Sequence, residues 1–264
     1  MLQKNWQELI KPSKIEFTPG NDKLRDATLV VEPLERGFGQ TLGNALRRVL
    51  LSSIRGAAVT SVKFDQVLHE FSSIPGVAED VVEITLNVKQ LAVKIHEGGI
   101  KKLNLSVKGP CQVTASMIDP LANVDVLNPD LVICNINKDI EFKMTLTVEE
   151  GKGYVPSSIT STKDNPIGLI PVDAIFSPIR NVAYKVENTR VGQATDYDKL
   201  TMEITTNGTI IPEDAVALAG RIISDQASYF VNFEEEEEVK EVETQSEPKL
   251  NPNLLRKVDE LELS

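Results

Sequence analysis

The chain has 264 residues, of which 41% are hydrophobic and 25% are charged, and its net charge is −11. This length allows a sizeable core and about two domains, and the composition is ordinary for a globular protein. Residues 234–264 carry −7 of the charge, which leaves −4 for residues 1–233 and no basic stripe of the kind that binds nucleic-acid backbones.

The N-terminal part predicts two strands and then a helix. Residues 15–17 and 27–31 are strand-like, and a Pro-Gly-Asn-Asp turn separates them. A turn loosened by glycines then leads into a helix over residues 42–53. Arg47 and Arg48 project about 100° apart on this helix, so they cannot both lie on its buried stripe. The apolar positions share one face: Leu42, Ala45, Leu46, Val49 and Leu50.

Residues 57–179 are mostly strand-like, with frequent turn residues between the strands. One short helix is expected at residues 78–86, after a Pro-Gly turn. In the last strand, apolar residues at 142, 144, 146 and 148 alternate with polar ones, which is typical of a half-buried strand. The strand-like segments include residues 57–64, 103–107, 131–134 and 141–148.

Two further strands, at residues 182–186 and 200–205, precede a second strong helix over about 212–231. Pro212 and the acidic residues after it suit the first turn of a helix. The apolar stripe of this helix is wider than one sheet contact needs, so we expect a second, intermolecular partner. It consists of Val216, Ala219, Ile223, Ala227 and Phe230, beside Ala215, Leu218, Ile222 and Tyr229.

No cysteine or histidine pattern predicts catalysis, a cofactor or a metal. Cys111 and Cys134 lack the spacing of metal or redox sites. His69 and His96 lie in unrelated segments without a nucleophile motif. No apolar run approaches the ~18 residues of a membrane span, and no secretory signal follows Met1, so we expect a cytoplasmic protein.

Two other local patterns also have ordinary interpretations. Gly37, Gly39 and Gly43 match neither a dinucleotide-binding nor a P-loop pattern, so we interpret them as allowing a sharp turn and a close helix contact. Asp196 and Asp198 alternate with other residues before a strand, but a metal would need further oxygen ligands. A turn with polar interface contacts is the simpler interpretation.

Six motifs follow one another in a fixed order along the chain. They are VEPLERGFG (31–39), TLGNALRR (41–48), GYVPS (153–157), VENTRVGQ (186–193), TDYDKL (195–200) and TNGT (206–209). With these motifs the chain resembles the α-subunit family of bacterial DNA-dependent RNA polymerases, in its N-terminal assembly region. The resemblance runs from about residue 10 to the end, and the matching separations make it specific.

The resemblance implies an α+β fold with two subdomains. A helix-on-sheet dimerisation subdomain is expected from residues 1–55 and 180–233, interrupted by a β-rich insert subdomain at 56–179. Residues 234–250, which are rich in glutamate, are expected to be a flexible linker. Residues 251–264 resemble the truncated start of a C-terminal domain. Because that domain binds DNA and activators in the family, we expect neither to be bound by residues 1–264.

The resemblance also implies a non-catalytic assembly role within DNA-directed RNA polymerase, a nucleotidyltransferase. The two helices of one chain are expected to pack on those of a second, and the homodimer to bind the β and β′ subunits for transcription in the cytoplasm, at the nucleoid. The expected dimer interface is Phe38, Leu42, Ala45, Leu46, Val49, Leu50, Val216, Ala219, Ile223, Ala227 and Phe230. The expected contacts with β and β′ are Arg36, Arg48, Leu51, Arg190, Asp196, Asp198 and Lys199.

Two other classes of function stay open as alternatives. A stand-alone enzyme on a β-rich fold would show turnover by the isolated chain, but the sequence offers no convergent acid, base or nucleophile. A nucleic-acid-binding module would need a basic face, which the near-neutral body and the acidic tail lack.

Overall fold

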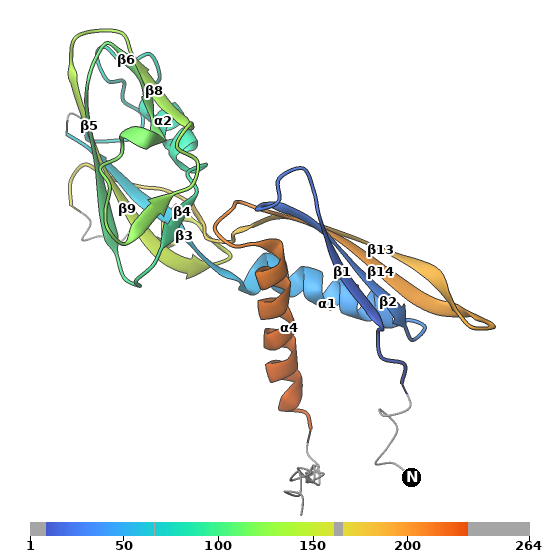
Figure 1. Ribbon diagram of the computed structural model, residues 1–264. Coiled ribbons are helices and arrows are strands. Elements are labelled where there is room, and N and C mark those ends of the chain that lie inside the picture. The colour runs from blue at the N-terminus through green and yellow to red at the C-terminus, as the bar shows by residue number, and fades with distance from the viewer. Residues whose placement is uncertain (1–8, 66, 161–165, 232–264) are drawn as a thin grey trace, which may run out of the picture. The chain divides into compact units, whose positions relative to one another are not determined.

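The computed structural model of the chain describes residues 9–65, 67–160 and 166–231 (Figure 1). Its helices and antiparallel sheets form an α+β architecture, which confirms the fold class predicted from the sequence. The chain divides into two units, Met1–Ala227 and Ser228–Ser264. The helices and strands described below lie in the first unit, apart from Ser228, the last residue of the last helix. The predicted linker and C-terminal segment, residues 234–264, lie outside the described residues.

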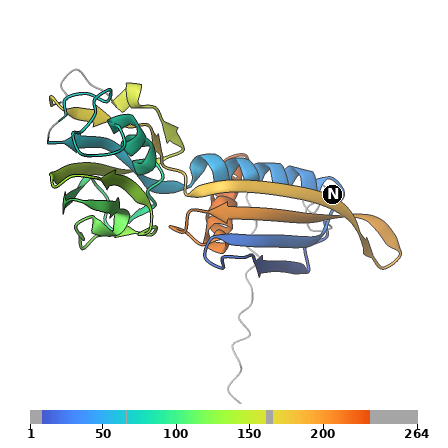
Figure 2. The same ribbon diagram turned by 90° about the horizontal axis from the view of Figure 1, so that it is seen from above.

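The first sheet combines segments from both ends of the chain. Its order is β1 (Lys14–Pro19), β2 (Asp26–Leu34), β14 (Ala194–Thr206) and β13 (Ile179–Val191), and all neighbours are antiparallel. Figure 2 shows these four strands side by side. The pairing of β2 with β14 joins the N-terminal hairpin to the C-terminal one, so everything between them is an insertion into one sheet.

Helix α1 (Phe38–Ser53) packs against β13 and β14. Its buried positions are Gly39, Gly43 and Leu50, which follow helical spacing along one side. The two glycines allow close contact, because a Cβ atom on Gly43 would lie 2.7 Å from Cδ2 of Tyr184. The helix begins four residues before the predicted start at residue 42, since Phe38 and Gly39 are helical rather than part of a turn.

The hairpin of β13 and β14 is longer than the sequence predicted. We expected strands at residues 182–186 and 200–205 with a loop between them, whereas the ladder continues to Val191 opposite Ala194. The turn falls at Gly192, whose φ of 61° lies in the left-handed region that glycine adopts readily. The polar residues of this stretch do not alternate with apolar ones, so the pattern that marks a half-buried strand is missing.

The second sheet has the order β5, β9, β3, β4 and β7, with β11 pairing on β3. The inward residues of β9 at 142, 144, 146 and 148 are buried in its core, which confirms the predicted alternation. The strands are β3 (Arg55–Phe64), β4 (Val93–Ile95), β5 (Lys101–Lys108), β7 (Val124–Val126), β9 (Glu141–Lys152) and β11 (Leu169–Pro171).

Helix α2 (Val81–Val88) contributes to the same core. It begins three residues later than predicted because Asp80 is its N-cap and accepts a hydrogen bond from the Glu83 amide at 2.7 Å. The remaining small elements are β6 (Cys111–Thr114) paired with β8 (Val132–Ile136), β10 (Tyr154–Val155) paired with β12 (Ala174–Ile175), α3 (Ser157–Thr160) and a 3₁₀ turn (Ala115–Met117).

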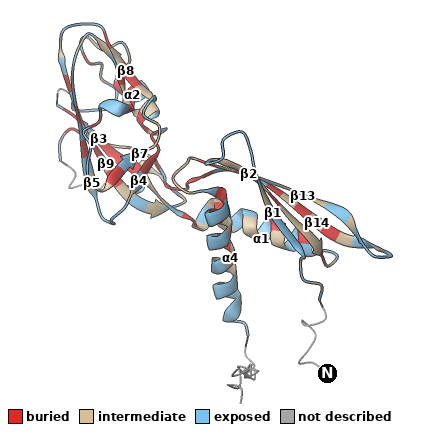
Figure 3. Cartoon of the chain, viewed as in Figure 1, coloured by how far each residue is buried: buried red, intermediate tan, exposed pale blue. Residues whose placement is uncertain are grey.

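Helix α4 (Pro212–Ser228) ends three residues before the predicted limit. Ala215 and Ala219 are buried in the core of the first sheet, but none of the described residues 220–231 is buried. In Figure 3 most of α4 is therefore pale blue. Among the described helices, none is both long and apolar enough to cross a membrane.

Asp173 links α2 to α3 by an ion pair and a backbone hydrogen bond. Its Oδ1 accepts from the Ser157 amide at 2.9 Å, and its Oδ2 lies 3.0 Å from Nζ of Lys89. The Ser157 amide, followed by Lys89, lowers the pKa of Asp173 from 3.8 to about 2. Because the folded-state pKa is depressed, this stabilisation is present above the unfolded value and is lost as the pH falls towards 2.

Substitution of Gly43 by alanine is expected to destabilise the fold. The new methyl group would force α1 away from Tyr184, and overpacking of this kind costs about 1–3 kcal/mol in the free energy of unfolding. Chemical denaturation measures the change. Gly98→Ala is the matched control, since its Cβ would meet only Glu150 Oε2 at 3.5 Å; equal losses for both variants would contradict the close contact.

Substitution of Asp173 by asparagine is expected to lower the free energy of unfolding by roughly 1 kcal/mol at pH 7. The difference from the parent protein should shrink as the pH is lowered through 3.8 towards 2, because the parent carboxylate then becomes protonated. Unfolding curves at several pH values measure this. Asp119→Asn, at an exposed position with no side-chain bond among the described residues, should show no such convergence.

Candidate protein-interaction surface

Helix α1 presents an apolar row beside its buried side. The row, Phe38, Leu42, Ala45 and Val49, follows the spacing i, i+4, i+7 and i+11, so its members lie along one side of the helix. Phe38 is 43% exposed, and the other three are half-buried. Leu46 is half-buried and packs partly on the core. An apolar row that the described part of the chain covers only in part is available to a partner.

Helix α4 carries a second apolar row that its own sheet covers even less. Val216 and Ile223 are half-buried, and only Val216 packs against the core cluster. Ala227 is exposed, and Phe230, beyond the end of the helix, is 87% exposed. Leu218, from the neighbouring row, is 49% exposed.

Two residues of the predicted dimer interface have no exposed surface. Leu50 and Ala219 are both 0% exposed and belong to the core of the first sheet. The physical reason is their angle on the helix: Leu50 continues the line of Gly39 and Gly43, and Ala219 lies one turn after the buried Ala215. They support the two rows from beneath and do not form part of the surface.

The arginine pair of α1 separates into two different environments. Arg47 donates a hydrogen bond from Nε to the backbone oxygen of Val182 in β13 at 3.1 Å. Arg48 is exposed, and its side chain has no hydrogen bond or ion pair within residues 9–65, 67–160 and 166–231. Leu51, one turn after Arg47, is half-buried against the core. Both arginines are exposed, but Arg47 is held by its hydrogen bond to β13, so Arg48 is the one whose side chain is left for a partner.

The N-terminus of α1 is held by a carboxylate from the far end of the sequence. Oδ2 of Asp198 accepts hydrogen bonds from the amides of Gly37 at 2.8 Å and Gly39 at 3.0 Å, and Asp198 is only 7% exposed. The sequence did not reveal this role, because the partners lie about 160 residues apart in the chain. Arg36, directly before this turn, is exposed.

The other predicted contact residues lie on the β13–β14 hairpin. Arg190 donates from Nε to the Gly192 oxygen at 2.6 Å, so it closes the turn. Lys199 is half-buried with its Nζ 3.8 Å from Oε2 of Glu32, and Asp196 is exposed. The residues 190–199, which were predicted to form a loop, therefore belong to an ordered hairpin.

Charge pairing on this hairpin is local and exposed. Lys185 Nζ lies 2.6 Å from Oε1 of Glu187, and this hydrogen bond, together with the charge of Lys185, lowers the pKa of Glu187. Exposed pairs of this kind contribute little to stability. They keep the outer edge of β13 charged, which discourages unspecific strand pairing.

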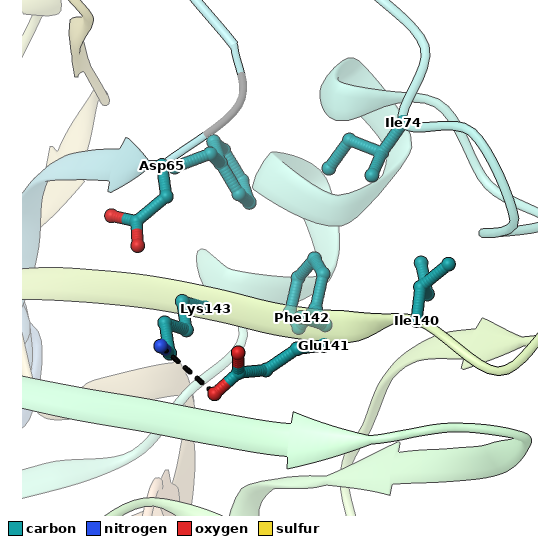
Figure 4. A pocket seen from close by; sticks show the side chains of 7 residues that line it. Asp65, Ile74, Ile140, Glu141, Phe142 and Lys143 are labelled. Carbon is teal, nitrogen blue, oxygen red and sulfur yellow. Dashed lines mark ion pairs between the residues drawn. The ribbon is translucent and has the colours of Figure 1, made fainter.

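A cavity of about 280 Å³ lies at one end of β9 in the second sheet (Figure 4). Nζ of Lys143 lies 2.8 Å from Oε1 of Glu141, and this hydrogen bond raises the pKa of Lys143. Neither a Cys nor a His lines it, and no three potential metal ligands gather anywhere in the described part of the chain. The lining residues are Phe64, Asp65, Ile74, Ile140, Glu141, Phe142 and Lys143.

Comparison with known protein families gives a match to part of the chain. Residues 62–177 match the family described as the RNA polymerase Rpb3/RpoA insert domain. The matched range begins within β3 and ends after β12, so it contains most of the second sheet and its core. The match supports an RNA polymerase subunit of the alpha/Rpb3 type, that is, a subunit within a nucleotidyltransferase complex.

Proposed function

We propose that this RNA polymerase subunit is the bacterial α type, which forms a homodimer and scaffolds the β and β′ subunits. The observation that carries the proposal is the pair of apolar rows on α1 and α4, which the described part of the chain leaves partly or wholly uncovered. The insert-domain match supports the same function from a different part of the chain.

A second copy of the chain is the partner that fits the two rows best. In a two-fold dimer the same surface is used twice, so α1 and α4 of one copy would meet α1 and α4 of the other. Stable obligate dimers bury about 2,000 Å² or more, with an apolar centre. The proposed interface consists of Phe38, Leu42, Ala45, Leu46, Val49, Val216, Ile223, Ala227 and Phe230.

The large subunits would then bind at the polar margin of this dimer. Arg48 extends from the exposed side of α1, and arginine holds carboxylates bidentately at interfaces. Arg36, Leu51 and the hairpin residues Arg190, Asp196 and Lys199 complete the proposed surface. Because β and β′ differ, each copy of the dimer would present this surface to a different subunit.

The proposal gives this chain no catalytic group. Catalysis of nucleotidyl transfer would lie in the large subunits. The role of the chain is to bring two surfaces together in a fixed geometry. Its cytoplasmic, nucleoid-associated location belongs to the same proposal.

Substitution of Ile223 by aspartate is expected to convert the dimer to a monomer. Ile223 lies in the proposed interface and outside the core cluster, so the charge would be buried only in the dimer. Size-exclusion chromatography with light scattering measures the mass. Ala217→Asp, at an exposed position of the same helix, should stay dimeric; a monomeric parent chain would refute the dimer.

Substitution of Arg48 by alanine is expected to leave the dimer intact and to weaken capture of β by about tenfold or more. The neighbouring Arg47→Ala variant is the matched control. It should lose about 1 kcal/mol of stability with its hydrogen bond to Val182, but bind β normally. Co-purification of the chain with β, with thermal unfolding in parallel, separates the two effects. Normal capture by the Arg48 variant would contradict the proposed contact.

A further inference from the structure

One carboxylate oxygen binds the two backbone amides that flank Phe38 in the first turn of α1. Oδ2 of Asp198 accepts from the amide of Gly37 at 2.8 Å and from that of Gly39 at 3.0 Å. Phe38 lies between these two amides, and its side chain is 43% exposed. The backbone of Phe38 is thus held at both ends while its ring remains accessible.

Among the described residues, no other side chain caps the helix at this end. Gly37 is the N-cap residue with a φ of 87°, no side chain of its own caps the helix, and its first turn contains no acidic residue. Helix N-termini carry unpaired amides and a partial positive charge, which a carboxylate satisfies. Asp198 in β14 supplies from the opposite hairpin what the local sequence lacks.

The geometry around the carboxylate is tight. A Cβ atom on Gly39 would lie 2.8 Å from Cγ1 of Val186 and 3.0 Å from Oδ2 of Asp198. Only glycine at this position lets the amide reach the carboxylate. The pairing of β14 with β2 is also irregular between Asp198 and Leu200, a feature that redirects side chains locally.

We propose that Asp198 is a positioning residue of the dimer interface: it holds Phe38, and with it the first turn of α1, in the orientation that a second copy binds. This inference rests on the proposed homodimer. Asp198 would act beneath the dimer interface and not in direct contact with a large subunit. Its carboxylate is buried and already accepts hydrogen bonds from two amides at the start of α1.

The test is a double-mutant cycle on the full chain, with the dimer dissociation constant measured by sedimentation. Asp198→Ala should raise this constant about tenfold, since two charge-assisted hydrogen bonds are lost. Phe38→Ala should raise it as well. If Asp198 acts through Phe38, the double variant should be no weaker than Phe38→Ala alone, within about twofold.

Two further variants serve as controls. Asp198→Asn keeps an acceptor oxygen and should retain most of the dimer affinity. If Asp198→Ala fails to fold, Asp198→Ser, which removes the carboxylate but keeps a polar side chain, replaces it in the cycle. Asp130→Ala, at an exposed position without a side-chain bond among the described residues, should change nothing. A normal dissociation constant for Asp198→Ala, or fully additive effects with Phe38→Ala, overturns the inference.

Amide hydrogen exchange separates the failure of this inference from that of the dimer itself. In Asp198→Ala the amides of Gly37 and Gly39 should exchange at least about tenfold faster, while those of the second sheet stay unchanged. A monomeric parent chain refutes the proposed dimer. Unchanged exchange of the Gly37 and Gly39 amides in Asp198→Ala refutes the positioning role of Asp198, whether or not the chain is a dimer.

Discussion

Helix α1 lies directly on the β13–β14 hairpin because Gly39 and Gly43 present no side chain to it. This close contact decides which sides of the helix remain available. With the glycine side and Leu50 turned to the sheet, the apolar row that begins at Phe38 lies at the margin of the core: Phe38 is exposed, and Leu42 and Val49 are half-buried against the core cluster. The candidate interaction surface therefore follows from the way in which α1 packs on the sheet.

The pairing of β2 with β14 lets the first sheet accommodate a large insertion. The chain leaves this sheet after α1 and returns at Ile179, where β13 begins. Between these points lies a second sheet with a core of its own, and residues 62–177 match a known insert domain. Because β2 pairs with β14, the two ends of the chain form one platform without any residue of the insert.

Local patterns were enough to predict much of this fold. The alternation in β9 and the helical spacing in α1 and α4 depend on burial against a neighbour, and burial leaves a periodic signal. The start of α1 could not be predicted in this way. The first turn is capped by Asp198, which is distant in the sequence. Without knowledge of that contact, Gly37–Gly39 resembles an ordinary glycine turn and not the start of a helix.

The hairpin and the arginine pair show a second limit of local patterns. Polar residues on both faces gave the ends of β13 and β14 the composition of a loop, although cross-strand pairing orders them. The sequence alone could not tell whether Arg47 or Arg48 is bonded to the rest of the chain, because the answer depends on the position of β13. The angle of 100° between neighbours required that they differ, but only the tertiary structure identifies the anchored one.

Two hydrogen-bonded attachments hold α1 in place, and they support the proposed role of Arg48 as a specific contact. Asp198 holds the helix at its first turn, and Arg47 ties it to β13 some two turns later. A flexible helix would lose part of any binding energy to the ordering of its backbone and side chains, whereas a helix fixed at two points has already lost that freedom on folding. In the proposed dimer, the polar margin of the surface would therefore discriminate between partners, while the apolar rows would supply the area that holds two copies together.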